Sequence, residues 1–188
     1  MKQLSTKSLL FFILLAVTMQ SCKKDKDQVE LPPAVLNSPE LITSLVIQFK
    51  DSANTNNVTR AEYRDPDGPG GNAAIKFDTI QLKINTTYFV ELIVLDETKN
   101  PMDTVSNEIW EERNDHQFFF KHTNTSIVTN YLDKDTNGYP VGLSTKWRTN
   151  SSQTGSSNII LKHQVNLKNG TEAPGETDID VNFQTKIK

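Results

Sequence analysis

Apolar and polar residues alternate with a period of two along most of the chain from residue 41 onward. Side chains of a strand point alternately to opposite faces, so this period predicts strands that bury one face. Segment 178–187 shows it most clearly, because a polar face that begins with Asp178 lies opposite an apolar one. The same pattern predicts further strands at 41–49, 74–82, 86–97, 116–122, 126–133, 142–149 and 157–167.

Turn-forming residues separate these strands, as in 65–72, 133–138 and 150–157. Segment 86–97 has apolar residues on both faces, which is typical of a central strand that is buried on both sides. Segment 104–116 is expected to hold a helical turn, and the long crossover helices that a parallel sheet needs are not predicted. The pattern therefore indicates an all-β fold. We expect an antiparallel immunoglobulin-like β-sandwich, with a jelly roll or a barrel as the alternative.

The first 21 residues follow a different pattern. Lys2 and Lys7 accompany an apolar run over residues 9–17, which is the build of a secretory signal peptide. The run is too short to span a bilayer as a helix, which takes about 20 apolar residues. Ser21 and Cys22 follow, and this segment resembles the lipobox of bacterial lipoproteins. The resemblance implies that Cys22 is lipidated and becomes the mature N-terminus.

Residues 22–40 are charged and then rich in proline, so they are expected to form a flexible tether. The predicted organisation is a signal peptide at 1–21, the lipidated cysteine and tether at 22–40, and a β-sandwich domain at 41–188. Lysines and aspartates directly after Cys22 loosely resemble the surface-export signal of Bacteroidetes lipoproteins. We therefore expect an outer-membrane lipoprotein of a bacterial cell envelope, facing either the periplasm or the surface.

Composition narrows the classes of function. The chain has 188 residues and a formal net charge of −3, which fits one domain and a leader. No basic patch with interleaved aromatic residues is present, so no nucleic-acid partner is expected. A single cysteine excludes an internal disulfide framework.

Five segments carry a resemblance to a known family; they are 65–75, 85–97, 111–120, 131–143 and 174–187. In this order they resemble a family of uncharacterised Bacteroidetes lipoproteins. Some members are labelled as having a type 1 periplasmic binding fold, a two-lobed α/β structure, whereas the strand pattern here predicts a sandwich. The resemblance implies a cell-envelope location and brings no known reaction with it.

Segment 133–138, DKDTNG, is a candidate calcium loop. Asp133, Asp135 and Asn137 match the opening of such a loop, and Gly138 permits its sharp turn. The twelfth position is Ser144 and not the bidentate glutamate, and the flanking segments are predicted strands. A plain hairpin turn, which the same residue types favour, is the alternative.

Segment 65–71, DPDGPGG, adds Asp65 and Asp67 as candidate ligands of the same kind. They could share a cation with the other loop if both lie at one end of the sandwich. The alternative is again a plain turn, and apart from structural calcium no cofactor is predicted.

No catalytic residues are assigned from the sequence, and the chain is not expected to be an enzyme. Carboxylates precede His116 in segment 111–116, EERNDH, and such a group can serve acid–base chemistry. The spacing matches no zinc-protease motif, and His122 and His163 show no ligand pattern. A solvated turn that leads into a core strand is the favoured interpretation.

Three short triplets, DSA, DTI and DTV, resemble the O-glycosylation motif of exported Bacteroidetes proteins. They would be modified at Ser52, Thr79 and Thr104.

Taken together, these features predict a non-catalytic binding, adhesion or accessory module. Its partners would be the membrane, through the lipid anchor, and an unknown protein or glycan. A hydrolase of envelope glycans or peptides is one alternative, and a small-ligand-binding component of a transport system is another.

Overall fold

The computed structural model describes residues 40–188, so the predicted signal peptide, Cys22 and nearly all of the predicted tether lie outside the described residues. The elements are, in chain order, β1 (Ser44–Asp51), β2 (Val58–Arg64), β3 (Lys76–Phe77), β4 (Ile80–Leu82), β5 (Thr87–Leu95), α1 (Val105–Glu111), β6 (His116–Thr123), β7 (Val128–Tyr131), β8 (Ser144–Arg148), β9 (Gln153–His163) and β10 (Glu176–Ile187). The described part of the chain is thus mostly β, as predicted, with one short helix in the segment where a helical turn was expected.

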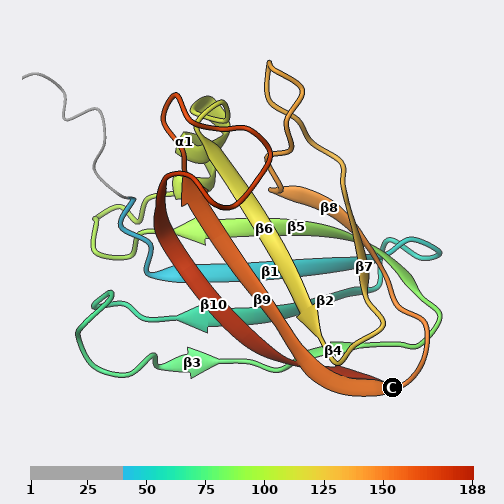
Figure 1. The fold of residues 1–188 in the computed structure, drawn as a ribbon. Helices are drawn as coiled ribbons and strands as arrows, with labels where there is room; N and C mark the ends of the chain where they lie inside the picture. Colours follow the sequence, from blue (N-terminus) through green and yellow to red (C-terminus); the bar gives the residue numbers. More distant parts are fainter. Residues whose placement is uncertain (1–39) are drawn as a thin grey trace, which may run out of the picture. The chain divides into compact units, whose positions relative to one another are not determined.

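The strands form two sheets that pack face to face. One sheet has six strands in the order β3-β2-β1-β5-β8-β7, and the other has four in the order β4-β10-β9-β6. Figure 1 shows β6, β9 and β10 running steeply across β1, β2 and β5. The predicted β-sandwich is confirmed at this level. The antiparallel expectation is wrong for one pair, because β4 runs parallel to β10.

The core between the sheets is built from the alternate positions that the sequence predicts. On β10, the five residues of the predicted apolar face are all buried; they are Ile179, Val181, Phe183, Thr185 and Ile187. Trp147 of β8 lies at the centre with no exposed surface, and edge-on aromatic contacts join it to Phe49 and Phe120. Aromatic packing of this kind adds to the hydrophobic stabilisation of a sandwich.

Strand β5 is an interior strand, as predicted, but the expectation that it is buried on both faces is wrong. Its Tyr88 and Val90 point into the core, whereas Phe89 is 40% exposed. The outer face of the six-stranded sheet is therefore partly open to solvent at this strand. Apolar residues on both faces of segment 86–97 were thus not sufficient to predict that both faces are buried.

Three strand predictions differ from the structure. The strand expected at 74–82 is divided into β3 and β4, which belong to different sheets, because the chain crosses between the sheets at Asp78 and Thr79. Strand β2 was not expected, since its sequence is largely polar. Strand β9 begins at Gln153, inside the segment predicted as a turn, because its full length pairs with β10.

One end of the sandwich brings together α1, the start of β6, the end of β9 and the start of β10 (Figure 1). At this end the pairing of β9 with β10 is interrupted by a register shift between Thr177 and Ile179. Such a bulge re-aims the side chain of the extra residue. The expectation that Asp178 faces solvent is therefore wrong, and its side chain is fully buried. No helix within residues 40–188 is long and apolar enough to cross a membrane.

Candidate functional site

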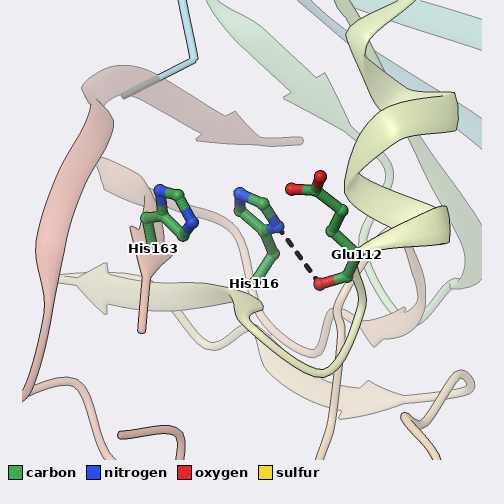
Figure 2. A group of neighbouring side chains, drawn as sticks. All are labelled: Glu112, His116 and His163. Carbon is green, nitrogen blue, oxygen red and sulfur yellow. Dashed lines mark hydrogen bonds between the residues drawn. The ribbon is translucent and has the colours of Figure 1, made fainter. Parts of the chain in front are cut away.

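Two histidines and a glutamate meet at this end of the sandwich. His116, the first residue of β6, pairs directly with His163, the last residue of β9. Their rings stack with centroids 4.4 Å apart and planes 16° from parallel. Glu112 follows α1, and one ligand atom from each of the three side chains lies within 4.8 Å of the others. Figure 2 shows the His116 ring between His163 and Glu112.

A hydrogen bond sets the protonation of the His116 ring. Its Nδ1 lies 3.3 Å from the carbonyl oxygen of Glu112, the contact drawn as a dashed line in Figure 2. A carbonyl oxygen only accepts hydrogen bonds, so Nδ1 is the donor and the neutral ring keeps its lone pair on Nε2. His116 has no exposed surface, and no hydrogen-bond partner for Nε2 is found within residues 40–188.

Asp178 faces the free nitrogen of His116. Its Oδ2 lies 3.8 Å from His116 Nε2, and neither carboxylate oxygen has a hydrogen-bond partner among the described residues. Burial raises the pKa of Asp178 to about 6; the charge of His163 and the backbone amide of Glu40 act against this shift, and the negative charge of Glu40 adds to it. A buried carboxylate without a donor is costly, because it has lost its hydration and gained no hydrogen bond in return.

Further carboxylates lie near Glu112 and Asp178. Burial raises the pKa of Glu40 to about 7, and the neighbouring charges of Glu108 and Glu112 add to the shift. Burial also lowers the pKa of His116 to about 4, with His163 as the second cause. Accumulated acidic groups thus lie beside a neutral imidazole, an arrangement that favours the binding of a cation.

A hollow of about 180 Å³ adjoins His163 and is lined by His163, Val165, Leu167, Gly175 and Glu176. It gives the cluster a side that is open to solvent, since His163 is only half-buried. Two imidazoles with adjacent carboxylates are suited to metal ligation or to proton transfer.

The sequence pointed to segment 111–116 but assigned it no role, and the pairing of His116 with His163 was missed. The two histidines are 47 positions apart, so no short motif contains them. Their meeting depends on the register of β6 with β9. The one signal in the sequence was a histidine in each of two predicted strands: His116 at the start of segment 116–122 and His163 inside segment 157–167.

The candidate calcium loop at 133–138 forms a turn whose carboxylates contact the protein. Asp133 accepts hydrogen bonds from the amide nitrogens of Gly142 and Ser144 at 2.7 and 2.8 Å. Asp135 accepts from the amides of Asn137 and Tyr139, and its Oδ2 lies 3.0 Å from the Lys168 ammonium. These contacts favour the plain turn, and calcium at this loop stays a prediction.

Asp65 and Asp67 lie in the turn after β2. Asp65 is buried, and its Oδ2 accepts a hydrogen bond from the Tyr63 hydroxyl at 3.2 Å. Asp67 accepts two hydrogen bonds from Asn72, which hold the pKa of Asp67 below its usual range. Within residues 40–188, the group of three or more histidine, cysteine or acidic side chains with converging ligand atoms is the one around His116, and neither aspartate belongs to it.

The three candidate glycosylation sites lie in connecting segments. Ser52 is exposed in the turn after β1, whereas Thr79, between β3 and β4, is half-buried. Thr104 is half-buried directly before α1. Ser52 is thus the most accessible of the three, and modification of all three stays a prediction.

His122 is expected to titrate far below an ordinary histidine. It lies against Trp147, and its ring nitrogens contact the hydroxyls of Ser157 and Thr129 at 2.9 and 2.8 Å. Burial lowers the pKa of His122 to about 4. The unfolded chain takes up this proton near pH 6.5 and the folded chain only near 4, so His122 reduces stability as the pH falls through that window. NMR titration of the ring should give the low pKa, and a value near 6.5 would contradict the burial seen here.

The chain was compared with protein-family models, curated proteins and solved structures. No protein-family model, curated protein or solved structure matches the chain. The resemblance to Bacteroidetes lipoproteins therefore stays a prediction from the sequence.

Proposed function

We propose that this protein is a lipid-anchored module of a bacterial cell envelope with a binding, adhesion or accessory role. The observation that carries the proposal is the leader, in which a basic start and an apolar run end at Ser21 and the sole cysteine, Cys22. Two or three acyl chains on Cys22 would hold the protein at the outer membrane, because each buried CH₂ contributes about 0.8 kcal/mol. The resemblance to uncharacterised Bacteroidetes lipoproteins supports the same location.

The folded part supports a non-catalytic binding role over capture of a small ligand. Large side chains that are fully buried, among them Trp147, Phe118 and Phe183, fill the space between the sheets. A transport receptor would instead need a deep apolar pocket. Two separate sheets with their own edge strands also support an immunoglobulin-like sandwich over a closed barrel. The partner, a protein or a glycan, would then contact the outer surface.

An envelope hydrolase is the second candidate, and a specific observation favours it. Glu112 lies beside His116 and also neighbours Glu40 and Glu108, and burial together with the charges of Glu108 and Glu112 raises the pKa of Glu40 to about 7. A carboxyl group with a pKa near neutrality is suited to donate and accept protons in catalysis.

Replacement of Cys22 by Ala tests the anchor. The wild-type protein should sediment with the membrane fraction, and Cys22→Ala should move nearly all of it to the soluble fraction, because no other acyl attachment site is proposed. Cell fractionation with immunoblotting measures the distribution. Ser21→Ala is the matched control, since alanine is also small and should leave the protein at the membrane. Retention of the Cys22→Ala protein in the membrane fraction would contradict the proposal.

A further inference from the structure

We infer that the cluster of Glu112, His116 and His163 binds a divalent transition-metal ion of the Zn²⁺ type. Asp178 lies beside this cluster and would either coordinate the ion or stabilise its charge without direct coordination. No feature of the proposed envelope role assigns this site, and the inference stands independently of the lipid anchor.

The first support is the lone pair of His116. Its Nδ1–H donates to the carbonyl oxygen of Glu112, so Nε2 carries a lone pair that points into a buried space. No donor within residues 40–188 reaches this atom. Metal-binding histidines commonly have this form, in which one nitrogen binds the metal and the other donates to a backbone carbonyl that fixes the ring.

The second support is the buried carboxylate of Asp178. Its side chain has no exposed surface, and its Oδ2 lies 3.8 Å from the same Nε2. Two hydrogen-bond acceptors without a donor between them are unfavourable at this distance. A cation between or beside them would satisfy both groups. The bulge that turns Asp178 inward would thereby gain a function.

The third support is the charge of the surroundings. Glu112 brings one carboxylate into the cluster, and the buried carboxylate of Asp178 lies 3.8 Å from His116 Nε2. The nearby cation Lys168, which disfavours a charged His116, is itself paired with Asp135 at 3.0 Å. The charges of the side chains around the cluster therefore favour the binding of a divalent cation.

The donor types select the metal. Two imidazole nitrogens with carboxylate oxygens are the ligands that Zn²⁺ takes in tetrahedral sites. Calcium and magnesium prefer all-oxygen sites, and imidazole suits zinc, copper, iron and nickel. Cobalt is useful as a spectroscopic substitute, because it accepts the same ligands and its absorption reports the geometry.

Metal binding requires a small closure of the cluster. Ligand atoms around tetrahedral Zn²⁺ are about 3.4 Å apart at Zn–N distances near 2.0–2.1 Å, whereas here they lie within 4.8 Å of one another. The two imidazole planes are 16° from parallel, so one ring must turn for both lone pairs to meet at one ion. His163 is the ring suited to turn, because it is the last residue of β9 and adjoins the hollow of about 180 Å³.

The test uses the full chain with Cys22 replaced by Ala, so that no thiol competes for metal. Thermal unfolding is followed with ZnCl₂, CaCl₂ or MgCl₂, and isothermal titration calorimetry gives the stoichiometry and affinity. Zn²⁺ should bind with one ion per chain and raise the unfolding midpoint, since a ligand that binds the folded state stabilises it. Co²⁺ should show the intense visible absorption of a tetrahedral site.

The variants localise the ion. Glu112→Gln and His163→Gln change residues that are exposed or half-buried, so both proteins should fold. Each should weaken Zn²⁺ binding by more than ~100-fold, which exceeds the ~10–100-fold loss typical of an outer-shell partner. Asp178→Asn should weaken Zn²⁺ binding by at least ~10-fold, which is the lower end of the range for an outer-shell partner. Glu111→Gln, at the exposed neighbouring position, is the matched control and should bind Zn²⁺ like the parent.

Two results would overturn the inference. One is the absence of any Zn²⁺-dependent shift in the unfolding midpoint of the parent protein. The other is a shift of equal size in the Glu112→Gln and His163→Gln variants, because zinc would then bind elsewhere on the chain.

Discussion

Replacing Asp135 with Ala should destabilise the domain by about 3–5 kcal/mol, the range expected when one partner of a buried ion pair is removed. The side chains of Asp135 and Lys168 are 0% and 2% exposed, and their charged atoms lie 3.0 Å apart. Without the carboxylate, the Lys168 ammonium keeps its hydrogen bond to the carbonyl oxygen of Arg113 but loses the one carboxylate in direct contact with it, and Asp115 and Asp133 act only from further away. Urea unfolding at pH 7 measures the change in the free energy of unfolding.

Two further variants separate charge from hydrogen bonding at this pair. Asp135→Asn keeps an oxygen that can accept from the amides of Asn137 and Tyr139, so its effect reports mainly the lost charge. Adding Lys168→Met to Asp135→Asn should restore part of the stability, because the uncompensated ammonium is then gone. Exposed ion pairs contribute less than ~1 kcal/mol to the free energy of unfolding. A loss of stability that small for Asp135→Ala would therefore contradict the burial of this pair.

Replacing Trp147 with Ala should destabilise the domain by about 3–5 kcal/mol, the range for removing a buried large aromatic side chain. Trp147 has no exposed surface, and its ring packs edge-on against Phe49, Phe120 and His122 at centroid distances of 5.4, 5.6 and 4.7 Å. The cavity would lie at the centre of the sandwich, where both sheets contribute side chains. Domains of this kind have only about 5–15 kcal/mol of stability in total, so the variant should unfold at much lower urea concentration.

The chain offers a matched control in its other tryptophan. Trp110 lies on α1, is 45% exposed and has the Arg113 guanidinium 5.0 Å from its ring. Its replacement by Ala should therefore change the free energy of unfolding by less than about 1 kcal/mol. Similar losses for the two tryptophan variants would show that Trp147 is not the central core residue.

The half-buried strands could be predicted from the sequence because their alternation is a local property. The buried face of β10 follows directly from its period of two, and so does most of that of β1. The division of segment 74–82 could not be foreseen, because the crossing between sheets at Asp78 depends on which strands are available on either side. The sequence of β2 is too polar to stand out, and it becomes a strand through its pairing with β1.

The candidate site could not be predicted from the sequence for a related reason. Its two histidines become neighbours only through the register of β6 with β9, and Asp178 turns inward only through the bulge in β10. Periodicity placed Asp178 on the wet face, which would be correct for a regular strand. The aspartates that the sequence did single out, Asp133 and Asp135, accept hydrogen bonds from backbone amides in a turn.

Mass spectrometry of the mature N-terminal peptide from the native host tests the proposed anchor most directly. We predict a chain that begins at Cys22, lacks residues 1–21 and carries a diacylglyceryl thioether on the sulfur. A mature protein with an unmodified Cys22 thiol, released freely into the medium, would contradict the account.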